Sequence, residues 1–321
     1  MTDRPSVCAE IEMDLVASAL GEAGPAAAGR VGAHLDRCAS CRDEVRRYQA
    51  IDAEVATLRG RPLAEARVDR VEAELRARLR DLRGRLVLYH VFPSPFGHIL
   101  IARSEQGIAL VEYLGRGTRL AGSRLARLPG VEPVADGRDL EAFHRELAEY
   151  LEGRRRELRW PIDLRLVRSD FHRDVLATTS SVPYGAVISY AGLAREVGRP
   201  SAVRAVAQAL RWNPLPIVIP CHRVIGSSGA LTGYAGGATT RKQKLLSVEG
   251  IPTVRMRGDF RIARETMYVR APGDPEYCLP TCASVDPFPV GGLLFASRDR
   301  AEAAGLAPCT ACRPDLHPLS R

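Results

Sequence analysis

The stretch that decides how this chain is interpreted is Asn213-Pro-Leu-Pro-Ile-Val-Ile-Pro-Cys-His-Arg-Val224. Its apolar run, Ile217–Ile219, predicts a short buried strand. Pro220 cannot donate a hydrogen bond to a sheet, so the strand should end there. Cys221 is therefore expected at the end of a core element, rigidly held and open to a ligand.

The Cys221-His222 pair suggests an activated nucleophile. A thiolate is the reactive form of cysteine, and a nearby histidine can remove the thiol proton. Adjacent side chains of an extended segment point to opposite sides, so His222 should act through a turn or a bridging water. The alternative is an inert buried thiol beside a histidine that only packs, and the motifs around the pair argue against it.

Four motifs carry a family resemblance: Asn213-Pro-x-Pro, Pro220-Cys-His-Arg-Val224, Gly233-Tyr-Ala-Gly-Gly237 and Leu245-Leu-x-x-Glu-Gly250. Together they resemble the O6-alkylguanine-DNA alkyltransferases, over residues 86–255. The resemblance implies an α+β fold: a small ribonuclease-H-like β-sheet subdomain at 86–165 and a helical, winged helix-turn-helix catalytic subdomain at 166–255. It also implies irreversible, single-turnover transfer of a methyl or alkyl group from O6 of guanine in duplex DNA to Cys221, with O4 of thymine as a further candidate.

The sequence before the cysteine agrees with a helix-turn-helix. Ser189 is a suitable N-cap for one helix and Gly198 a suitable end. A second helix is expected over Ser201–Leu210, after Pro200. This helix is rich in alanine, and only small side chains let a helix about 10 Å across approach a minor groove about 6 Å wide.

The resemblance also implies roles for single residues. His222 takes the Cys221 proton through a water, and Glu249 stabilises the imidazolium. Asn213 orients Tyr190 and the cysteine turn, and Tyr190 eases base rotation and donates a proton toward the departing guanine. Arg204 fills the gap left by the rotated base. The full set of expected DNA contacts is Arg204, Ala205, Gln208, Tyr234, Arg223, Val224 and Ala235.

Three positions depart from the usual family pattern. Ala207 replaces a commoner glycine in the second helix, Trp212 precedes the Asn-Pro pair, and Ala235 stands where some members have serine. These differences bear on groove fit and pocket selectivity, not on the thiol chemistry.

Composition sets wider limits. The 321 residues allow two or three domains, and Lys and Arg exceed Asp and Glu by 46 to 38, a net charge of +8. That excess fits a nucleic-acid partner without requiring one. No apolar run approaches the roughly 20 residues of a membrane span, and the N-terminus lacks a signal-peptide pattern. The chain is therefore expected in the cytoplasm, where its eight cysteines need an explanation other than disulfides.

One explanation is a metal site near the N-terminus. His34, Cys38 and Cys41 are spaced i, i+4 and i+7, as on one stripe of a helix, and Cys8 can complete a tetrahedral zinc site. The spacing resembles the anti-sigma-factor zinc finger, here expected over residues 1–55 and followed by a helical linker at 56–85. A structural role and a sigma-factor contact both remain open.

A second cluster lies near the C-terminus, at Cys278, Cys282, Cys309 and Cys312. With its surrounding residues it resembles the Ada-type metal-binding domain, here expected over residues 256–321. That family repairs methyl phosphotriesters at its first zinc-bound cysteine, which corresponds to Cys278. The stretch after Cys282 lacks the cations that phosphates attract and offers Asp286 instead, which favours a structural zinc.

Two other classes of protein share some of these features. A damage-responsive transcriptional regulator could use the N-terminal finger to contact a sigma factor, although the sequence contains no AraC-type DNA-binding domain. Alkyltransferase-like lesion binders cannot react, and the presence of Cys221 argues against that class. The leading hypothesis is a direct-reversal DNA repair protein with two accessory zinc modules.

Overall fold

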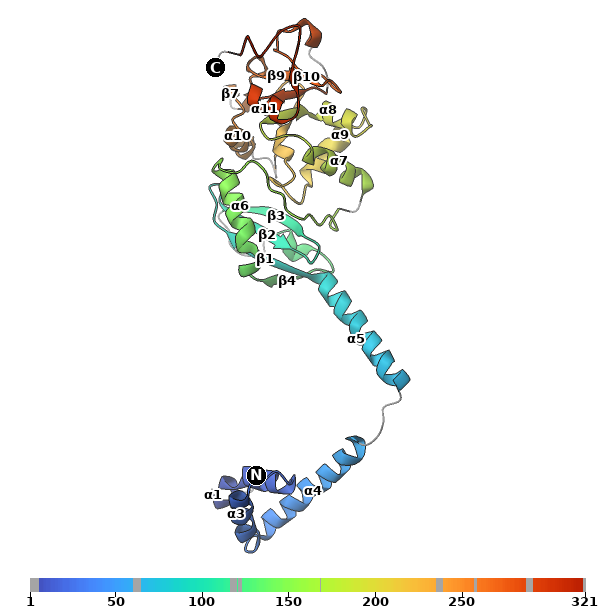
Figure 1. Cartoon of the computed structure of the whole chain (residues 1–321), viewed down its shortest axis with the longest axis vertical. Coiled ribbons are helices and arrows are strands. Elements are labelled where there is room, and N and C mark those ends of the chain that lie inside the picture. The colour runs from blue at the N-terminus through green and yellow to red at the C-terminus, as the bar shows by residue number, and fades with distance from the viewer. Residues whose placement is uncertain are drawn as a thin grey trace. The chain divides into compact units, whose positions relative to one another are not determined.

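The computed structural model describes residues 6–59, 65–115, 120, 123–167, 169–234, 239–256, 259–286 and 291–319. The chain divides into two compact units, residues 1–79 and 80–321. Figure 1 labels many of their helices and strands. Within the described residues, no helix combines the length and the apolar character needed to cross a membrane.

The first unit is helical. Its helices are α1 (Ser6–Glu10), α2 (Glu12–Ala19), α3 (Pro25–Leu35) and α4 (Ala39–Arg59). A small core of Leu15, Val31 and Val45 also holds Cys8 and Cys41. The single-helix stripe predicted for the metal ligands is wrong, because α3 ends at Leu35 and α4 begins only at Ala39. His34 and Cys41 therefore come from two helices, Cys38 from the turn between them and Cys8 from α1.

Helix α5 (Glu65–Arg85) leads into the second unit. Helices α4 and α5 lie on either side of residues 60–64, which are outside the described part of the chain. Ion pairs one turn apart, such as Arg76 with Glu72 at 2.6 Å, lie along its exposed surface and add only a few tenths of a kcal/mol each. Alternating acids and bases thus support a helix whose apolar residues Val71, Leu75, Leu79 and Leu82 are also exposed.

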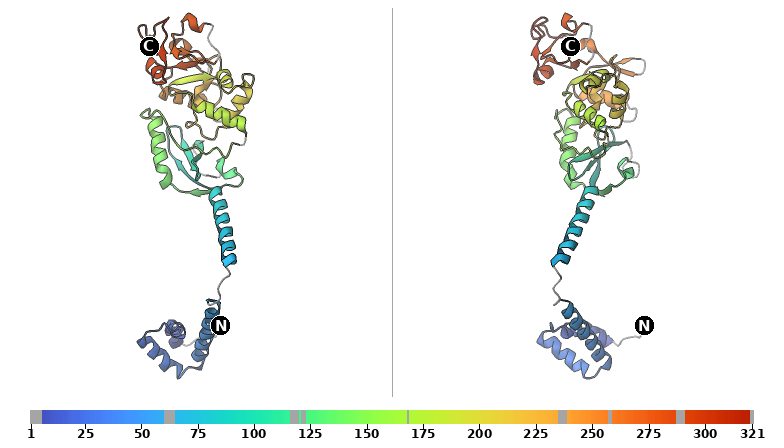
Figure 2. Two further views of the ribbon diagram at one scale, coloured as in Figure 1. Left: turned by 45° about the vertical axis from the view of Figure 1, so that its right-hand side comes forward. Right: turned by 90° about the vertical axis from the view of Figure 1, so that its right-hand side faces the viewer.

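A four-stranded sheet opens the second unit. Its strands are β1 (Leu86–Phe92), β2 (His98–Arg103), β3 (Ile108–Gly115) and β4 (Glu132–Ala135), in the order β3-β2-β1-β4. Alternate residues of β2 enter different cores: Ile99 and Ile101 join the core that includes α6 (Glu141–Leu151), while Leu100 joins the core on the other face. Helix α6 lies along this sheet in Figures 1 and 2.

The helical part follows. Its elements are α7 (Asp170–Ser180), β5 (Ala186–Ser189), α8 (Tyr190–Glu196), α9 (Val203–Arg211), β6 (Val224–Ile225) and α10 (Thr239–Val248). Ser189 caps α8 as predicted, because its hydroxyl accepts from the Gly192 amide at 2.9 Å. Gly198 takes a positive φ of 74° just after that helix, so the expected helix end is also confirmed.

The predicted strand at Ile217–Ile219 is absent, and this part of the prediction is wrong. The segment is a tight turn, bridged between Pro216 and Ile219. Ile217 has a φ of 76°, a region that a β-branched residue enters only at a cost of about 1–3 kcal/mol. Prolines on both sides remove donors that a strand would need. The surrounding core therefore enforces a strained turn directly before Cys221.

The C-terminal part is built from short elements. They are β7 (Thr253–Met256), β8 (Asp259–Ile262), β9 (Tyr268–Arg270), β10 (Glu276–Tyr277), β11 (Leu293–Phe295), α11 (Arg298–Ala303) and β12 (Ala307–Pro308). Strands β7 and β8 form a hairpin, and β10 pairs with β12. Strands β9 and β11 instead join β5 and β6 in one sheet, ordered β6-β5-β11-β9. The segment expected as a separate module at 256–321 thus shares a sheet with the helical part.

Candidate active site

Cys221 sits at the start of a short 3-10 turn, Cys221–Arg223, and its residue surface is 7% exposed. The Asn213 amide donates to the Cys221 sulfur at 3.2 Å and to the Ile219 carbonyl at 2.9 Å. Its oxygen accepts from the Leu215 amide at 2.9 Å. Asn213 therefore fixes the cysteine turn and solvates the sulfur. These contacts are all to the turn, and the orientation of Tyr190 by Asn213 stays a prediction.

His222 and Glu249 form a fully buried pair. Nε2 of His222 donates to a Glu249 oxygen at 2.6 Å, and both side chains have no exposed surface. Because the carboxylate fixes the proton on Nε2, the neutral ring carries its free lone pair on Nδ1. That Nδ1 is buried and has no hydrogen-bond partner among the described residues. It is the atom available to accept a proton.

Arg223 has a different place from the one expected. It was listed as a DNA contact, but it is buried and its Nε lies 3.1 and 3.0 Å from the two Glu249 oxygens. Its other nitrogens donate to the Val182 carbonyl at 2.6 Å and the Tyr150 hydroxyl at 3.2 Å. With its donors engaged inside the protein, the guanidinium is not free for phosphate. We therefore reassign it as a partner that holds Glu249.

Tyr150 is a site residue that sequence reasoning missed. Its hydroxyl donates to Glu249 at 2.5 Å from helix α6, and the Gly185 amide donates to the other carboxylate oxygen at 3.0 Å. Glu249 thus receives hydrogen bonds from four residues. Burial alone would raise its pKa, but the charges of Arg223 and His222 and these hydrogen bonds outweigh burial and lower the pKa to about 2.

The pKa of His222 is lowered, first by burial and then by the charges of Arg223 and Lys242, against the opposing pull of Glu249. The ring is therefore neutral at physiological pH. A neutral ring can act as a base, whereas a ring that is already protonated cannot. The pKa of Cys221 is raised by burial, with Asn213 and Lys242 acting in the opposite direction, so the thiol needs that base.

Lys242 is the second residue that was missed. It is fully buried, and its ammonium donates to the Val224 carbonyl at 2.5 Å and the Thr232 carbonyl at 3.1 Å. Burial lowers the pKa of Lys242, the neighbouring Cys221 partly opposes this effect, and the resulting pKa is about 8. Its spacing from Leu245, Leu246 and Glu249 puts it on the buried face of α10, a signal that the sequence did contain.

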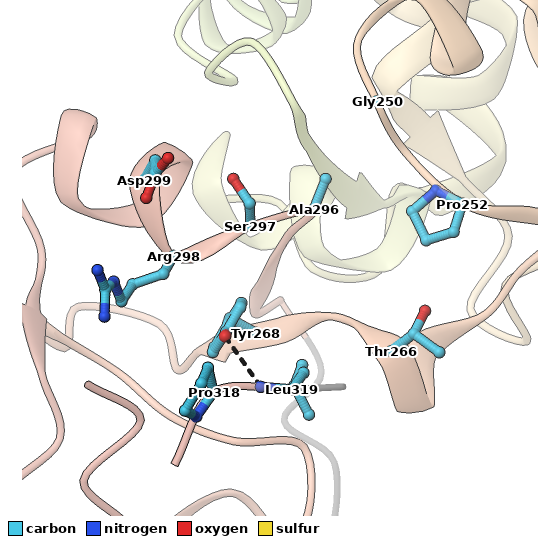
Figure 3. Close-up of a pocket in the computed structure, with 10 residues that line it drawn as sticks. All are labelled: Gly250, Pro252, Thr266, Tyr268, Ala296, Ser297, Arg298, Asp299, Pro318 and Leu319. Carbon is cyan, nitrogen blue, oxygen red and sulfur yellow. Dashed lines mark hydrogen bonds between the residues drawn. The ribbon is translucent and has the colours of Figure 1, made fainter. Parts of the chain in front are cut away.

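A cavity of about 280 Å³ opens at the thiol. Besides Cys221, the residues that line it are Val111, Glu112, Tyr113, Arg124, Leu210, Arg211, Trp212, Asn213 and Pro216. Trp212, one of the three departures from the family pattern, is exposed at 58%. A larger cavity of about 630 Å³ lies where the C-terminal part meets the end of α10, and its lining holds no cysteine or histidine (Figure 3). The smaller cavity therefore gives a ligand access to the thiol, whereas Tyr190, Tyr234 and Val224, which were expected to contact the base, do not line it.

The predicted DNA contacts of the second helix share one face. Arg204, Ala205 and Gln208 of α9 are exposed, while Val206, Ala209 and Leu210 are buried in the core. Val206 joins the same core as Cys221 and Val224. Helix α9 therefore packs its apolar face against the core that holds Cys221 and exposes a face of small and polar residues.

The remaining predicted residues lie close to the thiol turn, with one exception. Tyr190 is the first residue of α8, and its ring centre lies 5.6 Å from the Lys242 ammonium. The hydroxyl of Tyr234 lies 3.1 Å from that of Tyr113. Val224 is buried as the first residue of β6. Ala235 lies outside the described residues.

Two clusters have the composition and spacing of metal sites. Cys8, His34, Cys38 and Cys41 form one, and Cys278, Cys282, Cys309 and Cys312 form the other; within each, the ligand atoms lie within 4.8 Å of one another. In the first, the sulfurs of Cys8 and Cys38 are 3.9 Å apart and the Cys8 sulfur lies 3.7 Å from His34 Nε2. Four such donors can hold a metal ion between them.

The sequence around this site matches models of a known protein family. The 6-O-methylguanine DNA methyltransferase models match twice, the ribonuclease-like domain at residues 87–164 and the DNA binding domain at 170–251. The methylated-DNA–protein-cysteine methyltransferase of Methanosarcina barkeri is 37% identical over 163 residues, covering 96% of that protein and 50% of this chain. The chain belongs to this methyltransferase family.

Further comparisons show how this methyltransferase differs from its relatives. The constitutive methylated-DNA–protein-cysteine methyltransferase of Bacillus subtilis is 38% identical over 168 residues, 95% of its length and 51% of this chain. The solved structure of Mycobacterium tuberculosis OGT in complex with DNA is 33% identical in sequence. The match covers 92% of that chain and 50% of this one, with a TM-score of 0.44. Residues 273–315 match a further model, the metal binding domain of Ada. The methyltransferase part thus makes up about half of the chain.

Proposed function

We propose that the chain repairs DNA by direct reversal, moving a methyl or larger alkyl group from O6 of guanine in duplex DNA to the Cys221 sulfur; O4 of thymine is a further candidate. The observation that carries this proposal is a thiol at a cavity, hydrogen-bonded by Asn213 and followed by a neutral, buried His222. Incubation with a duplex containing O6-methylguanine should add one methyl group to the intact protein, as measured by mass spectrometry. An unchanged mass would contradict the proposal.

The transfer takes place in one displacement. A water carries the Cys221 proton to Nδ1 of His222, and Glu249 stabilises the imidazolium that forms. The thiolate attacks the alkyl carbon, the carbon–oxygen bond breaks with its electron pair going to O6, and Tyr190 donates a proton toward the departing guanine. The product on Cys221 is a thioether. Because a thioether is a stable product, each molecule reacts once.

DNA binding is assigned to the exposed face of α9. The target oxygen lies inside the duplex, so the base must be rotated out before the thiolate can reach it. Ala205 lets the helix approach the narrow minor groove closely, and Arg204 fills the space that the base leaves. The net charge of +8 favours association with the phosphate backbone.

Arg204→Ala should slow transfer by weakening base rotation. Opening a paired base costs a few kcal/mol and a mismatched base less, so the defect should shrink when the lesion lies opposite a mismatch. Single-turnover rates on paired and mismatched duplexes measure this. Arg173→Ala, an exposed arginine of α7, is the matched control. An equal Arg204→Ala defect on both duplexes would count against the role.

Zinc is the metal we propose for both clusters. Three thiolates with one imidazole, and four thiolates, are typical donor sets of structural zinc. Sulfurs that each lie about 2.3 Å from a tetrahedral zinc are about 3.8 Å apart, close to the 3.9 Å between Cys8 and Cys38. In this role the metal fixes the fold of each module.

Deleting residues 1–83 should leave methyl transfer intact and lower the bound zinc by one atom per chain. The reason is that residues 1–79 form a compact unit with a core of their own. Metal analysis and single-turnover assays of the two proteins measure the outcome. Loss of transfer in a remainder that stays folded would instead mean that the unit helps to position DNA.

The sigma-factor contact remains a prediction from the spacing of the N-terminal ligands. It corresponds to the alternative function, a damage-responsive regulator that acts through transcription. Co-purification of a sigma factor with the full chain, lost in a Cys38→Ser/Cys41→Ser variant, would support that function. Residues 1–55 otherwise act as a structural zinc finger.

Cys278 should not accept a methyl group from a phosphotriester. It is 2% exposed and packs in a core with Met267 and Val285, so a phosphate cannot reach it without rearrangement. The test incubates the Cys221→Ala protein with methyl-phosphotriester DNA and maps the modified peptides. A methyl group on Cys278 would overturn the structural role proposed for this zinc.

A further inference from the structure

The sheet β6-β5-β11-β9 joins the C-terminal metal module to the methyltransferase. Strand β11 pairs antiparallel with β5, with Leu293 opposite Ile188 and Phe295 opposite Ala186. On its other edge, β5 pairs with β6, which directly follows the Cys221–Arg223 turn. The module thus supplies two of the four strands in the sheet behind the reactive cysteine.

The metal ligands lie in the same core as methyltransferase residues. Cys278, Cys282 and Cys309 pack in one cluster that includes Val187 of β5 and Ile225 of β6. Cys278 is also tied to β9 by two backbone hydrogen bonds with Val269, of 2.7 and 2.9 Å. The metal site and the cysteine turn are therefore linked through continuous packing and hydrogen bonding.

Arg300 of α11 contacts two residues that lie beside the reactive site. Its guanidinium carbon lies 4.5 Å from the centre of the Tyr184 ring, within the range of a cation–π contact. Its aliphatic stem lies 3.0 Å from the position that a Cβ would take on Gly185, a residue with a φ of 76°. The arginine thus covers the Tyr184-Gly185 pair closely, in space that a side chain at 185 would need.

Tyr184 and Gly185 in turn hold the carboxylate. The Gly185 amide donates to Glu249 at 3.0 Å, and the Tyr184 hydroxyl donates to the Val248 carbonyl at 2.9 Å. The pair therefore fixes both the carboxylate and the end of the helix that carries it. A movement of this pair would therefore break one contact to the Glu249 carboxylate and one to the end of its helix.

We propose that the C-terminal metal module is an integral part of the methyltransferase site, and that Arg300 is a positioning residue that holds Tyr184 and Gly185 against Glu249. The role of Arg300 rests on the proposed function, in which Glu249 supports activation of Cys221. The shared fold does not depend on that function. The two parts of the proposal therefore have separate tests.

The module supplies its own matched control. Arg298 lies two residues before Arg300 on α11 and lines the cavity between Ala296 and Pro252 (Figure 3). In Figure 3 its guanidinium points away from Pro252. It pairs with Glu302 of its own helix at 3.4 Å. A substitution there changes the same helix and the same charge without touching Tyr184.

Arg300→Ala should lower the single-turnover rate of methyl transfer roughly ten- to a hundredfold, with unchanged affinity for unmethylated duplex. Arg300→Lys should restore most of the rate, because lysine keeps both the aliphatic stem and the cation over the ring. Arg298→Ala should behave as wild type. A wild-type rate for Arg300→Ala, or equal losses in Arg300→Ala and Arg298→Ala, would overturn the positioning role.

Hydrogen exchange tests the shared fold in the full chain without any assay of activity. Removing the metal with a chelator, or through Cys309→Ser/Cys312→Ser, should lower the protection of the β5 amides of residues 186–188 together with that of β9 and β11. Loss of soluble protein in the double variant has the same meaning, because an independent module would leave the methyltransferase folded. Unchanged β5 protection beside an unfolded module would overturn the integral role.

The two tests separate the possible failures. If Cys221 proves not to accept an alkyl group, the rates lose their meaning but the exchange result stands. If transfer occurs and exchange in β5 is independent of the metal, the proposed function holds and only this inference fails.

Discussion

The Cys221→Ala protein should leave O6-methylguanine in the duplex while still binding it. The only thiol that lines the described cavity at the turn is then gone, and the other seven cysteines belong to the two metal clusters. Intact mass and peptide mapping after incubation measure the transfer, and a binding assay on the methylated duplex shows that the variant is folded. Ser227→Ala, an exposed position after the same turn, is the control.

Removal of the lesion by Cys221→Ala at the normal rate would contradict the proposed function outright. A methyl group found on another residue of the wild-type protein would do the same. No partial effect is expected, because the acceptor atom of the reaction is itself deleted.

His222→Ala should lower the rate of transfer about 10²–10⁴-fold, the usual cost of losing a general base. Affinity for DNA should not change, since the side chain has no exposed surface. Glu249→Gln should act in the same direction, because it removes the charge that stabilises the imidazolium. Single-turnover kinetics at saturating DNA separate rate from affinity, and the exposed His317→Ala is the control.

The pH profile of the wild-type protein gives a second measurement on His222. Its pKa is lowered, so the ring stays neutral at pH values where an ordinary histidine, with a pKa of about 6.5, takes up a proton. Transfer should therefore persist below about pH 6.5 and fall only at lower pH. Wild-type rates in His222→Ala and Glu249→Gln would exclude the proton relay. A wild-type transfer rate that already falls above about pH 6.5 would exclude it as well.

Sequence motifs located the thiol, its histidine and its carboxylate because all three lie in short, unusual patterns. Tyr150 could not be found in this way. It lies 72 positions before His222, and an amphipathic helix does not distinguish a tyrosine that packs from one that also donates to a buried carboxylate. Lys242 could have been predicted, because its spacing places a lysine on the apolar face of α10.

The role of Arg223 could not be predicted from the sequence for a different reason. An arginine beside a nucleophile in a DNA-repair motif suggests a phosphate contact, and only the fold reveals that Glu249 lies next to it. Removing one partner of such a buried pair typically costs about 3–5 kcal/mol. The residue therefore fits a structural role better than a contact with solvent-exposed phosphate.

The strand predicted at Ile217–Ile219 is wrong because the hydrogen bonds available to the segment, rather than its hydrophobicity, decide its conformation. Branched apolar residues favour strands, yet Pro216 and Pro220 flank the run and cannot donate. The sheet that supports the cysteine turn is completed instead by β11. Nothing in the three residues of β11 indicates a partner more than a hundred positions earlier in the chain.

The pairing of β5 with β11 has a consequence during synthesis of the protein. Residues 186–188 leave the ribosome well before their partners at 293–295. At about 5–20 residues per second, that delay is roughly 5–20 s. During this interval β5 has one open edge, which can pair with other chains. The newborn methyltransferase is therefore exposed to aggregation until its metal module is made, and the supply of metal at that moment should influence how much of it survives.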